Sequence, residues 1–579
     1  MTKRAQILAI IAAVLLVFFP VIFGEISVVD DRDMLAACLN HPWNLKSIFF
    51  PGNGGGLYYR PLTIASYLLD LKLIGPDPAW MHLVNVLLHL ANTLLVFRIA
   101  SQLAPQFATD PTEKKERLLP LALALLWGFH PLVTESVDWI SGRTDILAAF
   151  FVLLSASFIL RFRENRASLS LALALLAFFG GVLSKEVALT FLPGALLLLL
   201  APHGTMEESV SVRKKRIALF IGLGCLVLLL FFLMRSFAFS SNYGKIGLSL
   251  KILQNNPQFG IFTVFRALGF YMKKLFYPWP LNFAIDGVDP LYELLAFPLL
   301  GFCLVLLWNR SLLSALFLAG VFLIAPAFTI AMGQIAWMPY AERYLYLPSI
   351  FVTLAAGLFA AKHIAPKMPA TIGKIALGGI ITLFAVTTFQ RNLLWQTNLA
   401  LLEDTAIQSD GNRTILALHS SALLSSDQPE KALAVAQRAA ATPMLGYNPD
   451  ADNLMGESLF RLGRTEEALV AYARAYQRSK KDSQSALEGM IEIHTAYIYQ
   501  HPQDISTAGH LLALEEAGLA LFKKNKDPMT LYQLGKAFHA AGKTKKAREY
   551  WKQALSHMPP DHEYRPFAAK LVRNQQGGT

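Results

Sequence analysis

Charged side chains are scarce in this sequence. Asp, Glu, Lys and Arg make up only 16% of the 579 residues, whereas 54% are hydrophobic. Soluble globular proteins carry about 25% charged residues, so the shortage excludes an ordinary soluble enzyme. It is confined to the first two thirds of the chain, because the sequence after Phe389 is polar and rich in Ala, Glu, Lys and Gln. We therefore predict a membrane domain over residues 1–390 and a water-soluble domain over residues 391–579.

Cysteine is also rare, and motifs for nucleic-acid binding are lacking. The three cysteines, Cys38, Cys225 and Cys303, lie far apart and two of them fall within apolar stretches. This pattern implies neither a disulfide framework nor a zinc site. The net charge is +12, but the Lys and Arg residues cluster beside apolar segments instead of forming a basic groove with aromatic residues. We interpret them as topology signals and expect no nucleic-acid partner.

Eleven apolar stretches are long enough for membrane-spanning helices, which predicts an all-α bundle. They are centred within Ile7–Phe23, Met81–Leu103, Leu118–Val133, Ile146–Leu160, Leu169–Leu183, Val187–Leu200, Ile217–Met234, Leu291–Leu307, Leu312–Met332, Leu345–Ala361 and Ile372–Phe389. A further segment, at about residues 261–282, contains Arg266, Lys273 and Lys274. Each of these cations costs about 3 kcal/mol at the centre of a bilayer, so we expect this juxtamembrane segment to lie on the membrane surface.

The positions of the basic residues predict which loops face outward. With eleven spans, Lys3, Arg4 and the run Arg213–Arg216 all fall on the cytoplasmic side, as the positive-inside rule requires. The external side then receives the first loop, residues 24–80, and all of residues 391–579. The polar clusters of the membrane domain also lie in these external loops.

The C-terminal domain contains a 34-residue pattern of small and large residues, best seen in two copies. The first copy has Met455, Gly456, Leu459, Gly463, Ala468, Tyr472 and Ala475, and the second has Leu534, Gly535, Phe538, Gly542, Ala547, Trp551, Ala554 and Pro559. The spacing is typical of tetratricopeptide (TPR) helical hairpins, which stack into an α-solenoid. Such a solenoid either forms a plain helical plug or presents a concave surface to an extended peptide or partner protein.

An acidic pair follows the first span. Asp30 and Asp31 are adjacent, and like charges raise each other's pKa, so one of them is a candidate general base. The alternative is a solvated acidic loop. A stripe of His82, Asn85, His89 and Asn92 recurs at steps of three and four along the second span, which places these residues toward the bundle interior. For the deeper two, hydrogen bonding between helices is the alternative.

More carboxylates and cations lie in or near the other external loops. They are Tyr59 with Arg60, His130, Glu135, Asp138, Arg143, Lys185 with Glu186, and Glu342 with Arg343. Residues of these types, brought together from several helices, suit a reaction in which a phosphate leaves and a hydroxyl attacks. Cations stabilise the leaving phosphate, and a carboxylate takes the proton of the hydroxyl.

These motifs together resemble the transmembrane and tetratricopeptide repeat-containing proteins. The resemblance rests on the acidic pair, Tyr59-Arg60-Pro61-Leu62-Thr63, His82-Leu83-Val84-Asn85, His130-Pro131, Glu135-Ser136-Val137, Ser141-Gly142-Arg143, Lys185-Glu186 and Glu342-Arg343-Tyr344-Leu345-Tyr346-Leu347-Pro348-Ser349. It covers essentially the full chain. It implies a glycosyltransferase of the GT-C superfamily, which transfers a sugar from a polyprenyl or dolichyl phosphate on the lumenal or periplasmic side. The animal members are viewed as protein O-mannosyltransferases.

The resemblance also implies roles for individual residues. Asp30 or Asp31 would be the catalytic base, with Asp30 favoured, and Glu135 or Asp138 could assist. Candidates to hold the lipid phosphate are Arg60, Arg143, Lys185 and Arg343, and His82 would contact donor or acceptor; His130, Glu186, Glu342 and Tyr59 are further candidates. For each arginine, the alternative is an interfacial anchor or a salt bridge, such as one between Glu342 and Arg343.

We expect transfer to Ser or Thr hydroxyls of a protein acceptor, with inversion at the anomeric carbon. The repeats would recruit the acceptor. The alternative is a non-catalytic assembly or secretion scaffold in which the repeats dock partners and the bundle is only an anchor. The question of a divalent metal, Mn or Mg, stays open because carboxylates alone do not settle it. The expected location is a bacterial inner membrane with periplasmic repeats, or an endoplasmic reticulum membrane with lumenal repeats.

Overall fold

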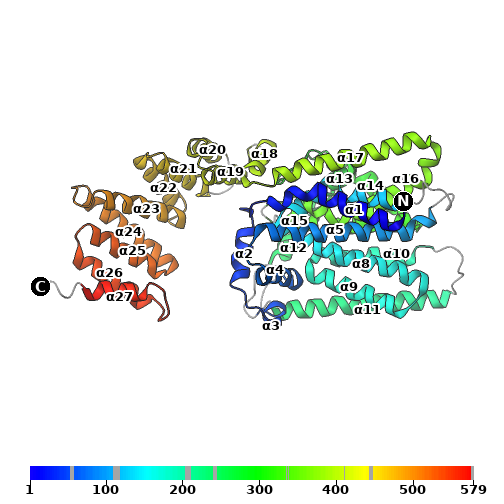
Figure 1. Ribbon diagram of the computed structural model, residues 1–579, viewed down its shortest axis with the longest axis horizontal. Coiled ribbons are helices and arrows are strands. Elements are labelled where there is room, and N and C mark those ends of the chain that lie inside the picture. Colours follow the sequence, from blue (N-terminus) through cyan, green and yellow to red (C-terminus); the bar gives the residue numbers. More distant parts are fainter. Residues whose placement is uncertain are drawn as a thin grey trace. The chain divides into compact units, whose positions relative to one another are not determined.

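The computed structural model describes residues 1–51, 58–107, 118–202, 210–238, 244–333, 336, 338–409, 411–442 and 448–574. Within these ranges the regular structure is helical, apart from one isolated bridge between Ile285 and Tyr340. The chain divides into two compact units, Met1–Thr405 and Ala406–Thr579 (Figure 1). The expected all-α fold class is confirmed.

Apolar helices dominate the first unit. In the described residues, eight helical segments are long and apolar enough to cross a membrane, and three shorter apolar helices accompany them. The helices concerned are α1 (Lys3–Phe18), α5 (Pro78–Leu103), α6 (Leu119–Gly128), α8 (Arg143–Asn165), α9 (Ser168–Ser184), α10 (Phe191–Leu200), α11 (Val210–Ala238), α14 (Tyr292–Asn309), α15 (Leu312–Gly333), α16 (Tyr346–His363) and α17 (Ala370–Leu394). Each coincides with one of the eleven predicted stretches, so the polytopic helical bundle is confirmed.

The bundle has a buried centre and a lipid-facing periphery. About two thirds of the apolar windows containing α8 and α16 are buried, whereas only 11% is buried in α14 and in α17. Small residues let the central helices approach closely. A Cβ on Gly194 of α10 would lie 2.6 Å from the Cβ of Ala319 in α15, and one on Gly320 of α15 would lie 3.0 Å from the carbonyl oxygen of Pro348 in α16.

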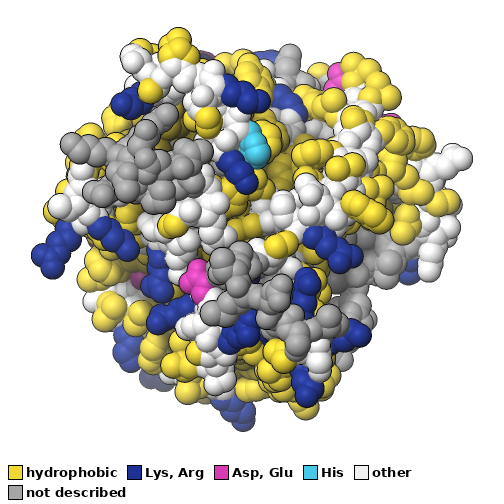
Figure 2. Space-filling view, turned by 90° about the vertical axis from the view of Figure 1, so that its right-hand side faces the viewer, with side chains coloured by type: hydrophobic (Ala, Val, Ile, Leu, Met, Phe, Trp, Pro, Cys, Tyr) yellow, Lys and Arg dark blue, Asp and Glu magenta, His cyan; other side chains and the backbone are white. Residues whose placement is uncertain are grey.

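Short helices gather at one end of the bundle. They include α2 (Asp31–Leu39), α3 (Leu45–Phe49) and α4 (Pro61–Leu73), and the N-terminus lies at the opposite end (Figure 1). Figure 2 looks onto that opposite end, where many Lys and Arg side chains and few acidic ones stand among apolar groups. The remaining connections contain α7 (Thr134–Asp138), α12 (Gly244–Asn255) and α13 (Pro257–Phe276). Among the described helices α13 does not qualify as a span.

The second unit consists of helical hairpins. Helix α18 (Asn398–Gln408) leads into it from the first unit. The hairpins α19/α20, α21/α22, α23/α24 and α25/α26 each pack as a pair, and α27 follows them. Their bounds are Arg413–Ser425, Pro429–Ala441, Asp450–Arg461, Thr465–Arg478, Gln484–Gln500, Thr507–Asn525, Pro528–Ala540, Thr544–His557 and Arg565–Asn574 for α19 to α27 in order.

The two best copies of the sequence pattern fold alike. Their turns contain Gly463 and Gly542, each at a φ of +74°, a left-handed conformation that glycine adopts without strain. Gly456 faces the ring of Tyr472 within its own hairpin, and Gly535 faces Trp551 in the corresponding way. The small residues at these positions therefore let an aromatic ring fill the space between the two helices of each hairpin.

Replacing Gly535 by Ala should loosen the last hairpin. The added Cβ would lie 2.4 Å from Trp551 Nε1 and 3.0 Å from the carbonyl oxygen of Ala547, and such overpacking costs about 1–3 kcal/mol. We expect faster hydrogen exchange in α25 and α26, measured by mass spectrometry on the full-length protein. Gly509→Ala is the control, because nothing lies within 4 Å of its added Cβ. Unchanged exchange in the Gly535 variant would contradict this packing.

Candidate active site

The two acids of the pair have different surroundings. Asp31 is buried with 1% of its surface exposed; its carboxylate accepts hydrogen bonds from the Ser141 amide at 2.8 Å, from the Ser141 hydroxyl, and from the Ser27 amide at 3.3 Å. Asp30 is exposed and sits just before α2 with a φ of +63°. Few residues other than glycine adopt this conformation, and such strain often marks functional positions. Asp31 thus links its own segment to the loop that contains Ser141, whereas Asp30 is exposed.

Burial shifts the titration of both acids. It raises the pKa of Asp31 to about 7, against the hydrogen bonds from Ser141 and Ser27, which favour the charged form. Asp30 keeps an exposed surface, but the protein packed around it removes part of its hydration and raises its pKa, and the positive charge of Arg343 opposes that rise. Arg343 is therefore an electrostatic neighbour of Asp30, although the two lie more than 300 residues apart in the sequence.

Arg343 is the central cation beside Asp30. Its guanidinium forms an ion pair with Glu135, and its amide donates to the other Glu135 oxygen at 2.8 Å. The guanidinium carbon lies 5.0 Å from the ring centre of Trp139 and 4.9 Å from that of Tyr344. The Trp139 indole donates to the carbonyl of Val29, the residue before Asp30, at 3.1 Å. The structure thus brings together three predicted residues, Asp30, Glu135 and Arg343.

A second group of charges surrounds the segment between α9 and α10. Lys185 Nζ lies 2.6 Å from both carboxylate oxygens of Asp145. Arg60 Nε donates to Glu186 at 2.9 Å, and Arg235 of α11 reaches the other Glu186 oxygen at 3.7 Å. Counting Arg343 with Glu135, four cations and three carboxylates therefore form ion pairs in this region.

The two groups of charges are electrostatically connected. Burial lowers the pKa of the Lys185 ammonium, Asp145 opposes this, and the positive charges of Arg60 and Arg343 lower it further. Lys185 Nζ also lies 5.9 Å from the ring centre of Tyr344, which stacks on Arg343. We call the set Asp30, Arg60, Glu135, Asp145, Lys185, Glu186, Arg235 and Arg343 the charged cluster.

Sequence reasoning missed Arg235 and Asp145 as members of the charged cluster. Arg235 is a single charge in the last turn of an apolar helix, which looks like an ordinary interfacial anchor. Asp145 follows the Ser-Gly-Arg motif by two residues, and its partner Lys185 lies 40 residues further along. The signal in the sequence for both residues was a single charge next to an apolar span, because such a charge usually pairs with one of opposite sign.

Arg143, which the sequence also offered as a phosphate-binding candidate, lies outside the charged cluster. It is fully buried and forms an ion pair with Asp70. Its Nε donates to Asn85 Oδ1 at 2.8 Å and its Nη2 to the Met81 carbonyl at 2.8 Å. Its guanidinium carbon also lies 4.7 Å from the ring centre of Tyr67. Every nitrogen of the guanidinium is thus engaged inside the protein, and Arg143 holds α4, α5 and α8 together.

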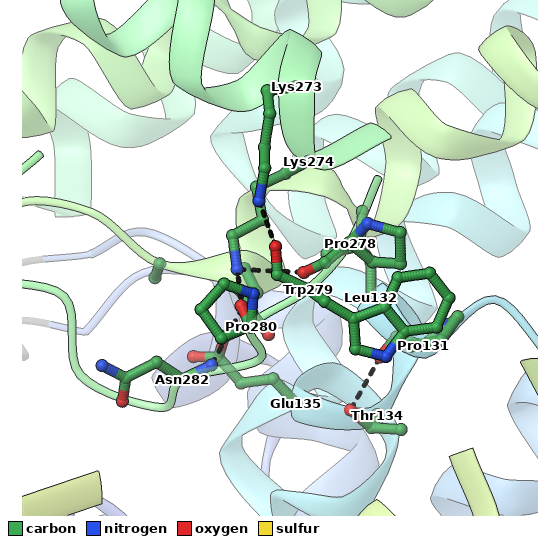
Figure 3. Close-up of polar contacts among 12 residues, drawn as sticks. Pro131, Leu132, Thr134, Glu135, Lys273, Lys274, Pro278, Trp279, Pro280 and Asn282 are labelled. Carbon is green, nitrogen blue, oxygen red and sulfur yellow. Dashed lines mark hydrogen bonds and ion pairs between the residues drawn. The ribbon is translucent and has the colours of Figure 1, made fainter. Parts of the chain in front are cut away.

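Glu342 is paired differently from the salt bridge weighed in the sequence. It forms an ion pair with Lys274 of α13 at 2.5 Å, and the Asn282 amide donates to it at 3.0 Å. Figure 3 shows Lys273 and Lys274 turned toward the carbonyls of the Pro278–Pro280 segment. Glu342 and Arg343 are neighbours in sequence but bind separate partners. Glu342 therefore ties the juxtamembrane segment to the start of α16.

The other candidates have structural surroundings. The Tyr59 hydroxyl donates to the Phe49 carbonyl at 3.0 Å. His130 is buried, and its Nδ1 accepts a hydrogen bond from the Leu132 amide at 3.3 Å. Its Nε2 lies 3.3 Å from the carbonyl oxygen of Leu275. His82 is buried beside Gly24, on which a Cβ would lie 2.9 Å from His82 Nε2.

Asp138 stands apart from the charged cluster. Its two carboxylate oxygens are buried and have no hydrogen-bond partner among the described residues. Burial raises its pKa well above the usual range, and the charge of Arg391 opposes this. Within the described residues, no three His, Cys, Asp or Glu side chains are grouped so that they could hold a metal ion.

The fold and the charged cluster define an integral membrane protein with a polar site at one end of a helical bundle. Its relatives bear names that agree with the resemblance stated above, and this resemblance is confirmed. Protein O-mannosyl-transferase TMTC1 of Mus musculus is 39% identical over 97 residues, which cover 17% of this chain and 9% of the relative. Protein O-mannosyl-transferase TMTC4 of Homo sapiens is 35% identical over 145 residues, which cover 23% of this chain and 20% of the relative.

A longer match covers more than half of the chain. Protein O-mannosyl-transferase F38B6.6 of Caenorhabditis elegans is 24% identical over 368 residues, which cover 59% of this chain and 48% of the relative. In each of these three matches the chain spans less than half of the relative's length. No protein-family model matches the chain.

Replacing Arg143 by Met should destabilise the bundle. The change leaves Asp70 charged and buried without its partner, which costs about 3–5 kcal/mol. We expect a lower denaturation midpoint in detergent, partly restored when Asp70→Leu removes the second charge. Arg98→Met is the control, because Arg98 is exposed on α5. A variant that unfolds like the wild type and loses only donor binding would show that Arg143 is a ligand residue instead.

Asp31 should make stability depend on pH in the neutral range. Its pKa is about 7 in the folded protein and 3.8 for the ordinary side chain, so the folded state holds a proton that the unfolded state releases. This stabilisation is complete below about pH 4 and is lost as the pH rises through 7. We expect the thermal midpoint of Asp31→Asn to change less with pH between pH 5 and 8 than that of the wild type. Asp33→Asn should keep the pH dependence of the wild type. Equal slopes for wild type and Asp31→Asn would contradict the shift.

Proposed function

We propose that this protein is a membrane glycosyltransferase that transfers a sugar from a polyprenyl phosphate-linked donor to Ser or Thr hydroxyls of a protein acceptor. It would act in the manner of a protein O-mannosyltransferase, with inversion at the anomeric carbon. The observation that carries the proposal is the exposed Asp30 carboxylate on a segment that Trp139 connects to Arg343 of the charged cluster. The names of the relatives support the same class of activity.

The cations would bind the donor phosphate. Arg60, Arg235, Lys185 and Arg343 are four cations of the charged cluster, and ion pairs with carboxylates hold them in place. A phosphodiester brings one negative charge and the departing phosphate brings two, so these cations would stabilise the leaving group more than the bound donor. Interactions that strengthen as charge develops lower the barrier of the chemical step.

Asp30 would act as the general base. As the acceptor oxygen attacks the anomeric carbon, its proton passes to the Asp30 carboxylate, and the bond from the anomeric carbon to the phosphate oxygen breaks with its electron pair. The charge of Arg343 opposes the rise in the pKa of Asp30 and so favours the deprotonated form that accepts this proton. Attack and departure on opposite faces of the sugar give inversion. Asp31 would hold the loop through Ser141 and Ser27.

The distribution of charge supports an assignment of the two ends of the bundle to the two sides of the membrane. The end of the bundle seen in Figure 2 is rich in Lys and Arg, which favours the cytoplasmic side. Helices α2 to α4 lie at the other end, which would face the periplasm or the lumen. A polyprenyl phosphate-linked donor and a secreted acceptor would meet there. The helical hairpins of residues 413–557 would recruit the acceptor.

Asp30→Asn should abolish transfer while the fold is kept. The amide cannot take the hydroxyl proton, and we expect the rate to fall by about 100-fold or more, because general base catalysis contributes about 10²–10⁴-fold. The assay measures transfer from defined polyprenyl phosphate sugars to candidate acceptor proteins in detergent or nanodiscs. Asp33 is an exposed acid in the first turn of α2, three residues after Asp30; Asp33→Asn is the matched control and should keep its activity. Equal transfer rates for wild type and Asp30→Asn would show that Asp30 is not the general base, and no transfer by either would favour the non-catalytic scaffold.

A further inference from the structure

Asn398 binds the segment that leads to Asp30. Its side-chain oxygen accepts a hydrogen bond from the Val28 amide at 2.9 Å. Its side-chain amide donates to Glu25 Oε2 at 2.9 Å and to the Ile26 carbonyl at 3.0 Å, and its backbone amide donates to Glu25 Oε2 at 3.0 Å. One side chain therefore contacts three of the five residues before Asp30, although it lies about 370 positions away in the sequence.

Neighbouring residues extend this contact. The Gln396 carbonyl accepts from the Glu25 amide at 3.0 Å, and the Gln396 side chain donates to the Pro20 carbonyl at 2.9 Å. The Asn392 side chain donates to the Val17 carbonyl at 2.9 Å. The end of α17 and the start of α18 thus follow the chain from the end of α1 to Val28 and fix its course.

Asp30 is held from both directions. Asn398 binds the chain before it, and Ser141 binds the Asp31 carboxylate after it. Trp139 donates to the Val29 carbonyl between these two points. The left-handed backbone at Asp30 is unfavourable for a residue with a side chain, and such a conformation persists only where the surroundings impose it. These hydrogen bonds fix the backbone on both sides of Asp30.

We propose that Asn398 is a positioning residue for Asp30, a role that rests on the proposed function. Its amide supplies an acceptor for Val28 and donors for Glu25 and Ile26 at the same time, a combination that only Asn and Gln side chains offer. Asn398 is half-buried at the first residue of α18, outside the apolar core. Its removal should therefore displace the Asp30 loop without unfolding the bundle.

The test compares Asn398→Ala with the wild type in the transfer assay. We expect kcat to fall by about 10- to 100-fold, because a displacement of about 1 Å can cost about 100-fold, while KM for the donor stays within about twofold. Asn40→Ala is the matched control; it removes one local side-chain hydrogen bond, to the Ala36 carbonyl of α2, and should leave kcat unchanged. An Asn398→Ala enzyme with wild-type kcat would overturn the proposal.

A reversed hydrogen bond provides the rescue. Asn398→Asp places a carboxylate against Glu25 and should lower kcat further than the alanine variant. Combining it with Glu25→Gln removes that repulsion, because the Gln amide can donate to the Asp carboxylate, which still accepts from the Val28 amide. The hydrogen bond to the Ile26 carbonyl is not restored. We expect the double variant to recover at least about tenfold in kcat over Asn398→Asp alone. Equal kcat values for the single and double variants would contradict a positioning role.

Hydrogen exchange separates this proposal from the proposed function. If wild type transfers no sugar to any acceptor, the proposed function is wrong, and exchange at the amides of residues 28–34 still reports on the loop. Asn398→Ala should raise exchange there and leave α5 and α8 protected. Unchanged exchange would mean that Asn398 does not hold the loop, and faster exchange through the whole bundle would assign it a general structural role.

Discussion

A charged group inside a lipid bilayer is stable only when it is paired or reaches water. The chain has few charges in its membrane unit, and most of those in the bundle interior and the loops at the α2–α4 end form ion pairs: Arg143 with Asp70, Lys185 with Asp145, Arg343 with Glu135, and Lys274 with Glu342. Each pair joins helices or loops that are distant in the sequence. Pairing therefore fixes how the helices assemble and also decides which charges remain for chemistry.

The acids that remain open are few. The carboxylates of Asp31, Glu135 and Asp145 form hydrogen bonds or ion pairs within the bundle. These three residues therefore hold the site in place. Asp30 is exposed, and its backbone is held in an unfavourable conformation by the residues around it. Ion pairs that hold the residues around the exposed Asp30 carboxylate are a preorganised arrangement, because the cost of orienting these charges is met during folding and not during the reaction.

The sequence predicted what depends on local pattern. Runs of apolar residues located the eleven helices of the bundle, the cations of residues 261–282 kept α13 out of the set of spans, and the spacing around Gly463 and Gly542 located two hairpins. It could not predict partners. Arg143 and Arg343 look equivalent in the sequence, because both are cations near external loops. In the structure Arg143 forms an ion pair with Asp70, and Arg343 forms one with Glu135. Those choices depend on contacts over 73 and 208 residues, which local patterns do not encode.

The central claim is that the charged cluster beside Asp30 binds a polyprenyl phosphate. The most direct measurement is photo-crosslinking with a polyprenyl phosphate that carries its reactive group next to the phosphate, followed by mass spectrometry of the labelled peptides. The account predicts labels on the peptides containing Arg60, Lys185 and Tyr344, and competition by unlabelled polyprenyl phosphate. Labels confined to the lipid-facing helices α14 and α17, or labels that unlabelled lipid does not displace, would contradict it.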